Sequence, residues 1–285
     1  MGDLVLPPGA GPHPAVVTVF GSGPGGRHEG DWGSRFAAAG FGFYSYDRPG
    51  SGESTGDWRA MDFDGRAGET IAAVAAVAAH PAVDPARIAL FGGSQGGWVA
   101  PLAAVRAPAS AVAAVATFSG PGVSPAVQEE FRIGRLLAHD GLGEDGVAYQ
   151  RAVYQRLREG EPAQTIAADV AAVGDVPWAE YLRADHELVD LEFLRGILDY
   201  DPLPTLRQLR CPLLAVFGAD DDLVPVADSV RLIEGALAES AHPDYAVVVF
   251  PGADHGIRPM AATGPGQPRA AGFFELLVSW LARRV

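Results

Sequence analysis

The segment Ile88–Gly97, with the sequence IALFGGSQGG, constrains the fold of this chain more than any other. Its first four residues are apolar and suit a buried β-strand, and the segment that follows, Trp98–Val105, has the apolar spacing of a helix. A strand can turn into a helix so abruptly only where side chains are missing, and four glycines flank the single serine here. The sequence therefore predicts a strand, a tight turn and a helix, with Ser94 at the tip of the turn.

A serine in such a turn is held in strained backbone geometry and presented outward. The first N–H groups of the following helix, beginning with Gln95, point at the same place and can stabilise a negatively charged oxygen. The turn therefore indicates a nucleophilic serine. The pattern Gly-x-Ser-x-Gly is short, however, and glycine-rich turns between strand and helix also occur without chemistry.

Composition limits the classes of function. With 285 residues, 48% of them hydrophobic and 20% charged, the chain can bury one large core. Its formal net charge of -14 argues against nucleic-acid or anionic-membrane partners, because these require basic patches. The single cysteine, Cys211, excludes an internal disulfide and a cysteine zinc site, and we expect a buried structural thiol. We also expect neither a metal nor an organic cofactor.

The amino-terminal residues lack the basic and long apolar regions of a leader, and no later stretch offers about 18 uninterrupted apolar residues. A cytoplasmic protein is therefore predicted.

Six short apolar runs, several of them rich in valine and aromatic residues, have the composition of strands covered on both faces. They are Ala15–Phe20, Phe41–Tyr46, Ile88–Phe91, Ala113–Phe118, Leu213–Phe217 and Ala246–Phe250. Helical patterns alternate with them at Trp32–Ala39, Asp64–Ala79, Gln95–Ala107, Val226–Ala238 and Ala270–Ala282. The alternation predicts an α/β fold with a mostly parallel sheet covered by helices on both faces.

A long gap between predicted strands, from Val123 to about Asp199, is charged, helical in pattern and rich in aromatic residues. Ordinary crossover helices would fit it, but its length favours a cap over the carboxyl ends of the strands, where open α/β sheets bind ligands. We expect a core of residues 1–122 and 200–285 and a helical cap subdomain of residues 123–199. Four aromatic side chains are expected to contact a substrate there: Trp98, Phe131, Trp178 and Tyr181.

A nucleophilic serine needs a base, and the base needs a carboxylate that fixes its tautomer. Both residue types follow late strands. The loop Gly218–Pro225 carries three consecutive aspartates, and the loop Pro251–Gly256 carries His255. The aspartates could instead form a solvated acidic turn or a cation site. The chain order Ser, Asp, His is the one associated with the α/β-hydrolase sheet.

Four passages together carry a resemblance. They are FGSGPG at 20–25, YDRPGSGES at 46–54, GGSQGGWVAPL at 92–102, and the paired loops GADDDLVP at 218–225 and DHG at 254–256. With them, almost the whole chain resembles the α/β-hydrolase superfamily, particularly its capped bacterial esterases and serine-peptidase-like relatives.

The resemblance implies that Ser94 is the nucleophile, His255 the general base and acid, and Asp221 the orienting carboxylate, with Asp220 and Asp222 as its nearest rivals. It also implies an oxyanion hole made by the backbone N–H groups of Gln95 and of the loop after the first long strand, where we place Ser22. The segment 47–54 is expected to shape a turn near the site, with Arg48 pairing locally.

Two departures from the family pattern stand out. Phe20 occupies a position where many relatives carry histidine, and the usual leading hairpin of the sheet is largely missing. A shortened leading segment can leave a sheet edge exposed. We therefore expect two kinds of partner. One is a small-molecule acyl substrate, and the other is a second copy of the chain in a homodimer formed through such an edge or through the cap.

Two alternative hypotheses assign the chain to other classes of protein. Gly21, Gly23 and Gly26 form a literal dinucleotide-binding pattern, with Asp47 about 20 residues further on. The following residues, Arg27–Gly33, suit a loop better than a phosphate-binding helix, and this reading leaves the serine, aspartate and histidine passages unexplained. A non-catalytic ligand-binding protein on the hydrolase scaffold is the second rival.

The expected function is hydrolysis of a carboxylic ester of a small, largely apolar molecule through a Ser-His-Asp triad and an acyl-enzyme. Peptidase or amidase, thioesterase and lactone hydrolase activities on the same triad stay open as alternatives.

Overall fold

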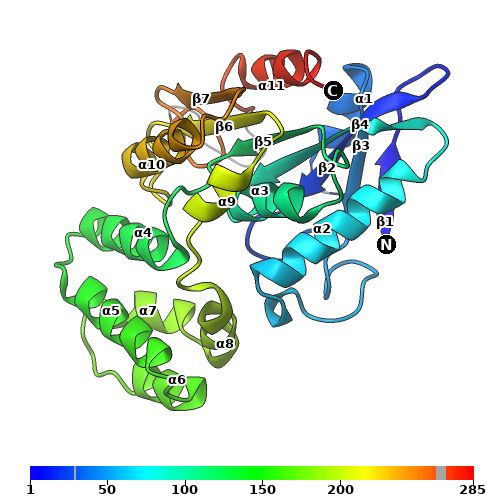
Figure 1. Cartoon of the computed structure of the whole chain (residues 1–285). Helices are drawn as coiled ribbons and strands as arrows, with labels where there is room; N and C mark the ends of the chain where they lie inside the picture. Colours follow the sequence, from blue (N-terminus) through cyan, green and yellow to red (C-terminus); the bar gives the residue numbers. More distant parts are fainter. Residues whose placement is uncertain (29, 261–267) are drawn as a thin grey trace.

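The computed structural model describes residues 1–28, 30–260 and 268–285. A seven-stranded sheet lies at its centre, with the strand order β1-β3-β2-β4-β5-β6-β7 (Figure 1). The strands are β1 (Gly2–Val5), β2 (His13–Val19), β3 (Gly42–Tyr46), β4 (Val83–Gly93), β5 (Ala114–Phe118), β6 (Leu213–Gly218) and β7 (Tyr245–Phe250). Strands β2 to β7 pair in parallel, and β1 pairs antiparallel with β3.

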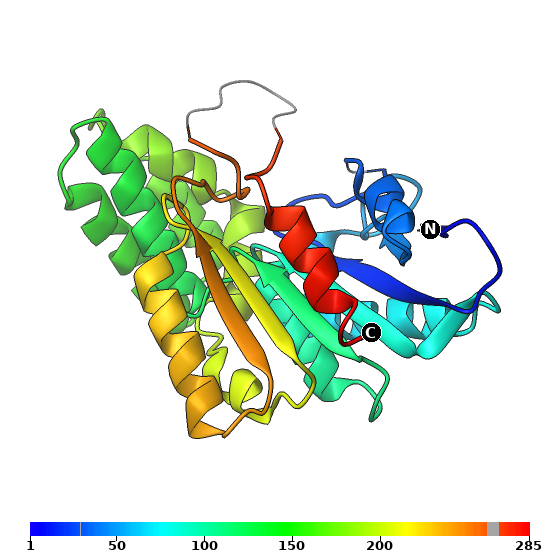
Figure 2. The same cartoon turned by 90° about the horizontal axis from the view of Figure 1, so that it is seen from above.

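Helices cover both faces of the sheet, and each face has its own apolar core (Figure 2). On one face lie α1 (Trp32–Ala38) and α11 (Phe273–Leu281). The other face carries α2 (Phe63–Ala78), α3 (Gly96–Arg106), α9 (Leu203–Gln208) and α10 (Val226–Glu239). The continuous apolar runs of the sequence follow from this double burial, since all six residues of β6 are buried. The predicted α/β-hydrolase fold is confirmed.

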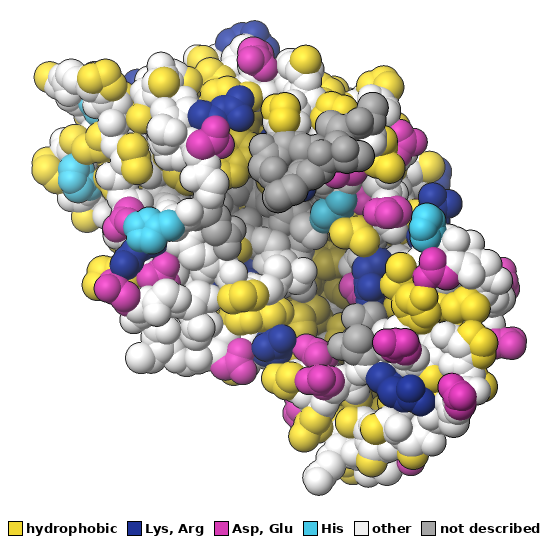
Figure 3. All heavy atoms as spheres, turned by 180° about the vertical axis from the view of Figure 1, so that it is seen from behind, with side chains coloured by type: hydrophobic (Ala, Val, Ile, Leu, Met, Phe, Trp, Pro, Cys, Tyr) yellow, Lys and Arg dark blue, Asp and Glu magenta, His cyan; other side chains and the backbone are white. Residues whose placement is uncertain are grey.

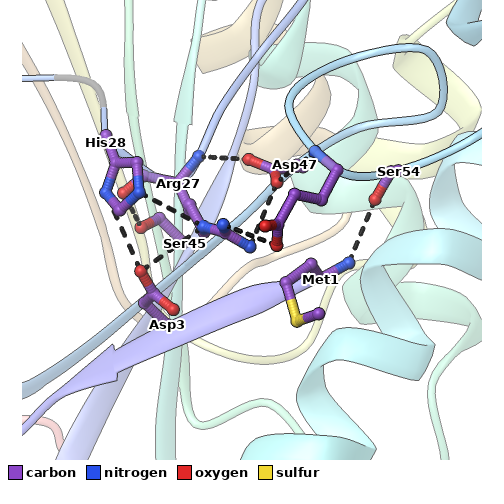
Figure 4. A network of polar contacts seen from close by, with 8 residues as sticks. Met1, Asp3, Arg27, His28, Ser45, Asp47 and Ser54 are labelled. Atoms are coloured by element: carbon purple, nitrogen blue, oxygen red, sulfur yellow. Dashed lines mark hydrogen bonds and ion pairs between the residues drawn. The ribbon is translucent and has the colours of Figure 1, made fainter.

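Strand β1 is absent from the sequence prediction, because four residues are too few for a period to be recognised. It is the short leading strand of the sheet, and its start is fixed by a polar network (Figure 4). The Met1 ammonium donates to Ser54 Oγ at 3.0 Å, and the Asp47 backbone N–H donates to the Met1 carbonyl at 2.8 Å. Strand β1 is thus attached to the 47–54 turn.

Local signals explain where helices begin. The Asp62 carboxylate accepts the Gly65 backbone N–H at 2.8 Å at the start of α2, which satisfies one of the unpaired donors of the first turn. Ser124 precedes α4, and Pro125 occupies the first helical position, where its missing N–H costs nothing. Across the described residues, none of the helices combines the length and the apolar character needed to cross a membrane.

Five helices lie between β5 and β6, in the segment for which the sequence predicted a cap. They are α4 (Pro125–His139), α5 (Asp145–Arg158), α6 (Ala163–Ala171), α7 (Ala179–Asp185) and α8 (Leu188–Ile197). They enclose two small apolar clusters of their own and form a group beside the sheet (Figure 1). The division into a core of residues 1–122 and 200–285 and a cap of residues 123–199 stays a prediction.

Acidic and basic side chains are interspersed over the face that Figure 3 shows. Elsewhere in the structure, charged side chains form ion pairs, such as Arg284 with Asp244 at 2.7 Å. Such exposed pairs contribute little to stability individually, so the two apolar cores hold the fold together.

Candidate active site

Ser94 follows the last residue of β4 and adopts a left-handed backbone conformation with φ of 51°. Its backbone N–H donates to the Phe118 carbonyl at 2.9 Å, and its own carbonyl accepts the Gly97 N–H at 2.7 Å. A Cβ atom at Gly96 would collide with the Val19 carbonyl oxygen, so the approach of α3 to the sheet requires glycine at this position. Such strain, which costs on the order of 1–3 kcal/mol, is typical of functional sites.

His255 and Asp221 are in direct contact. The distance between His255 Nδ1 and Asp221 Oδ2 is 2.8 Å, and the Asp221 side chain is fully buried. The other carboxylate oxygen, Oδ1, accepts the backbone N–H groups of Leu223 and Val224 at 2.9 and 3.0 Å. With the Asp221 carboxylate accepting from Nδ1–H, the His255 Nε2 is left as the basic atom of the ring.

The neighbouring aspartates differ from Asp221, because Asp220 and Asp222 are exposed on the same turn. Within the described ranges, no group of three or more His, Cys, Asp or Glu side chains could hold a metal ion. Of the three consecutive aspartates, Asp221 is therefore the one that contacts the histidine.

The end of β5 connects the serine turn to the histidine loop. Phe118 accepts the Ser94 N–H, and the next residue, Ser119, donates from Oγ to the His255 carbonyl at 2.8 Å. Ser119 is fully buried, and its N–H donates to the Val216 carbonyl at 2.7 Å. Ser94 and His255 also lie in the wall of one cavity, of about 250 Å³.

The loop after β2 lies against the serine. A Cβ atom at Gly21 would be 3.3 Å from the Cβ of Ser94. Ser22 and Gln95, whose N–H groups the sequence assigned to the oxyanion hole, lie with Ser94 in the wall of a second cavity of about 410 Å³. The structure thus brings all the sequence-predicted core site residues to one edge of the sheet.

Two buried arginines hold this loop from behind. Arg48 Nη1 donates to the carbonyls of Gly21 and Gly23 at 3.0 and 2.5 Å, and its guanidinium lies 4.8 Å from the centroid of the Trp58 ring. Arg66 Nη2 donates to the Phe20 carbonyl at 2.5 Å, and its Nη1 donates to the Gln95 side chain. These hydrogen bonds of Arg48 reach residues more than 20 positions earlier in the chain, beyond the local turn in which the sequence predicted its partner.

Arg66 is a residue that the sequence analysis missed. Burial, followed by repulsion from Arg48, lowers its pKa to about 9. The available signal was its position on the buried face of α2, among Phe63, Ala67 and Thr70. A charged residue on an apolar helix face requires partners, which in this case are backbone and amide oxygens of the site.

Of the four aromatic residues predicted to contact substrate, the structure places one at the site. Trp98 lies in the wall of the 410 Å³ cavity, and its Nε1–H donates to the Val123 carbonyl at 3.0 Å. The other three were expected to contact the substrate, but none of them lies in the wall of either described cavity at Ser94, so the prediction is wrong about their position. Phe131 lines a hollow between α4 and α5, Trp178 packs against Tyr149, and Tyr181 donates to Asp140.

Other side chains, not predicted from the sequence, complete the wall of the larger cavity. The apolar ones are Trp58, Pro121, Phe193, Leu194 and Leu223. Two ion pairs lie among them, Arg59 Nε with Asp190 Oδ1 at 3.0 Å and Arg132 Nε with Glu129 Oε2 at 2.8 Å. The larger cavity therefore combines apolar surface with balanced charge.

The geometry around Asp47 does not support dinucleotide binding. No helix begins at the glycines of the predicted phosphate loop, because α1 starts at Trp32. The Asp47 carboxylate accepts the backbone N–H groups of Glu53 and Arg27 at 3.0 and 3.1 Å, and these bonds lower its pKa (Figure 4). Asp47 thus serves the 47–54 turn rather than a ribose.

A family model described as the alpha/beta hydrolase family matches residues 4–267, and the chain belongs to this family. It is 30% identical over 227 residues to a monoacylglycerol lipase of Mycolicibacterium smegmatis, an alignment that covers 78% of this chain and 73% of the lipase. The chain is therefore a hydrolase of the alpha/beta hydrolase family.

Solved structures share the fold at lower identity. The alpha/beta hydrolase GrgF from Penicillium sp. sh18 is 21% identical, with a TM-score of 0.64 over 99% of this chain and 93% of that chain. Dipeptidyl peptidase 4 of Porphyromonas gingivalis is 19% identical, with a TM-score of 0.59. The match to this peptidase covers 100% of this chain, which spans only 33% of the length of the peptidase.

Proposed function

We propose that the protein is a serine hydrolase that cleaves carboxylic esters of small, largely apolar molecules through an acyl-enzyme on Ser94. The observation that carries the proposal is the 2.8 Å contact between His255 Nδ1 and the buried Asp221 carboxylate, with the imidazole in the wall of the cavity that Ser94 also lines. A histidine oriented in this way is the base that a serine nucleophile requires.

The proposed reaction begins when His255 Nε2 takes the proton of Ser94 Oγ and Oγ attacks the ester carbonyl carbon. The backbone N–H groups of Gln95 and Ser22 stabilise the negatively charged oxygen of the tetrahedral intermediate. The protonated His255 then gives its proton to the alcohol oxygen as the carbon–oxygen bond breaks. Water, activated by the same imidazole, attacks the acyl-enzyme, releases the acid and restores Ser94.

An ester is the leading substrate class because the relative with 30% identity is named as a monoacylglycerol lipase. Peptide, amide, thioester and lactone hydrolysis use the same chemistry, and the structural similarity to a dipeptidyl peptidase concerns the fold alone. A non-catalytic binding protein on this scaffold is the alternative from another class.

Replacing Ser94 by alanine tests the proposal directly. Ser94→Ala is expected to stay folded and to lose about 10⁴-fold or more in kcat, because the nucleophile is removed while the binding surfaces remain. The assay is a panel of p-nitrophenyl esters of graded acyl length, run beside aminoacyl amides on both proteins.

An organophosphorus probe provides the control for reactivity. It should label the parent protein at Ser94 and leave Ser94→Ala unlabelled, as seen by mass spectrometry. Hydrolysis of the amides alone would reject the ester assignment. Absence of both labelling and turnover in the parent protein would favour the binding protein.

A further inference from the structure

Two cavities of different chemistry meet at Ser94, which belongs to the wall of each. The larger, of about 410 Å³, lies between the serine turn and helices α4 and α8 and is called the cap cavity here. The smaller, of about 250 Å³, lies among the ends of β2 to β5, α1 and the histidine loop, and is called the aromatic cavity. A substrate bound at Ser94 can therefore extend in two directions.

The aromatic cavity is named for its wall. Its apolar residues include Val19, Phe20, Trp32, Phe43, Phe91 and Phe118. The Arg269 guanidinium lies over the Trp32 and Phe118 rings, 4.6 and 4.9 Å from their centroids, so even its cationic group is stacked on aromatic surface. Such a wall favours a flat apolar group, since rings pack on rings with a gain beyond simple burial.

The cap cavity offers hydrogen bonds. Beside the apolar residues named above, its wall holds Ser22, Gln128 and the ion pairs Arg59–Asp190 and Arg132–Glu129, whose side chains are between 21% and 35% exposed. An alkyl chain placed against these four charged groups would displace water from them without returning hydrogen bonds, which is unfavourable. A polar, uncharged group would retain those bonds.

The chemistry of ester cleavage decides which part of the substrate enters which cavity. The leaving oxygen receives its proton from His255, so the alcohol must lie on the imidazole side of the serine. His255 and Gly256 lie in the wall of the aromatic cavity. With the alcohol in the aromatic cavity, the acyl chain on the same carbon takes the other direction, toward the cap cavity, whose wall also holds the predicted oxyanion donors Gln95 and Ser22.

We propose that the substrate is an ester of a flat, ring-containing alcohol with an acid that bears polar, uncharged hydrogen-bonding groups, the alcohol binding in the aromatic cavity and the acyl group in the cap cavity. The assignment rests on the proposed ester hydrolysis. It narrows that function, because it assigns the flat apolar group of the substrate to the leaving alcohol. The aromatic cavity is smaller than the about 300–1,000 Å³ of sites for drug-sized ligands, which suits a ring-sized group.

The test crosses two variants with two substrate series. One series keeps the acetyl group and varies the alcohol among methanol, glycerol and naphthylmethanol, which avoids the activated leaving group of a phenol. The other keeps methanol and compares succinamate, which ends in an amide, with pentanoate. Since kcat/KM reports acylation, it is the quantity to compare.

Thr18→Phe is designed to fill the aromatic cavity, because the half-buried Thr18 lies in its wall on β2, where an aromatic side chain suits a strand. The parent should prefer the naphthylmethyl ester over the glyceryl ester, and Thr18→Phe should lower kcat/KM for the naphthylmethyl ester about tenfold or more while methyl acetate changes about twofold or less. The matched control is Leu194→Phe in the cap cavity. It should alter the succinamate-to-pentanoate ratio and leave the alcohol ratios unchanged.

Equal effects of Thr18→Phe on every ester, an effect confined to the acyl series, or a parent preference for the glyceryl ester would each overturn the proposal. Failure of the parent to hydrolyse any ester in a Ser94-dependent way would instead reject the proposed function. If thermal unfolding shows that Thr18→Phe is misfolded, the proposal is tested instead by product inhibition of the parent enzyme with the free alcohols. Free naphthylmethanol should compete with methyl acetate more strongly than glycerol does, and equal inhibition would overturn the assignment.

Discussion

At the scale of single residues, the site depends on charges that the reaction itself does not use. Arg48 and Arg66 are buried, and their donors are directed to carbonyl oxygens of the loop that lies against Ser94. Their hydrogen bonds engage these oxygens and hold the loop in place beside Ser94. We regard both as positioning residues, because neither lies in the wall of a cavity at Ser94.

Replacing Arg66 tests this role. Arg66→Met should lower kcat about tenfold to a hundredfold with little change in KM, because a misplaced oxyanion loop affects the transition state more than ground-state binding. It should also destabilise the protein by about 1–3 kcal/mol, since the Phe20 carbonyl and the Gln95 amide lose a buried donor. Steady-state kinetics and urea unfolding provide the two measurements.

The conservative variant Arg66→Lys keeps one cationic donor and should recover part of kcat. A purely structural role would instead lower stability in both variants and leave kcat of the folded fraction at the parent value.

At the scale of elements, the crossing of β4 and α3 controls the geometry of Ser94. A Cβ atom at Gly96 would meet backbone atoms of Val19 and Phe20, which cannot move like a side chain. The clash therefore separates α3 from β2 and shifts the Gln95 N–H relative to Ser94.

Gly96→Ala should accordingly lose most of its activity and be destabilised by about 1–3 kcal/mol through overpacking. Gly68→Ala is a suitable control, since this glycine lies in α2 and a Cβ atom there has open space. The control should retain full activity and gain up to about 1 kcal/mol in stability. Circular dichroism melts and ester turnover would show whether the two glycines differ in this way.

The short leading strand depends on the turn that follows β3. Asp47 anchors this turn through the N–H groups of Arg27 and Glu53, and these bonds lower its pKa in the folded protein. A carboxylate with a lowered pKa stabilises the fold above its unfolded-state pKa, and this contribution is lost as the pH falls through the folded-state pKa.

Asp47→Asn should therefore lower Tm near neutral pH, and the difference from the parent should shrink as the solution is acidified below the usual pKa of a carboxyl group and the parent carboxylate becomes protonated. Thermal melts between neutral pH and pH 3 measure this. A constant difference across the range would mean that the ionised carboxylate contributes nothing.

At the scale of the whole molecule, the sequence predicted six of the seven strands and five of the six helices described on the two faces of the sheet, all except the six-residue α9, because each of the predicted elements is long enough to show its period. Strand β1 was missed since it has only four residues. The separate placement of Phe131, Trp178 and Tyr181 could not be predicted, because helical periodicity does not say which neighbour a buried face meets.

The positions of Ser94, Asp221 and His255 were predictable for a different reason. Each follows a strand of a parallel sheet, so the topology alone collects them at one edge. For Arg66 the local signal, a charged side chain on the apolar face of α2, indicates that a partner is needed but does not say which loop provides it. The cytoplasmic location and the homodimer, through a sheet edge or through the cap, stay predictions.

The end of β5 is hydrogen-bonded to both residues of the proposed serine–histidine pair, and this has a consequence for how such a protein can evolve. The Phe118 carbonyl accepts the Ser94 N–H and Ser119 Oγ donates to the His255 carbonyl, and the helices α4 to α8 follow only after these two residues. The two proposed reacting residues are thus both fixed to the end of β5, whereas the helices α4 to α8 are inserted as one continuous segment before β6. Recombination between β5 and β6 could therefore replace this helical segment with another. Such exchanges would diversify substrate specificity while leaving the positions of Ser94 and His255 unchanged.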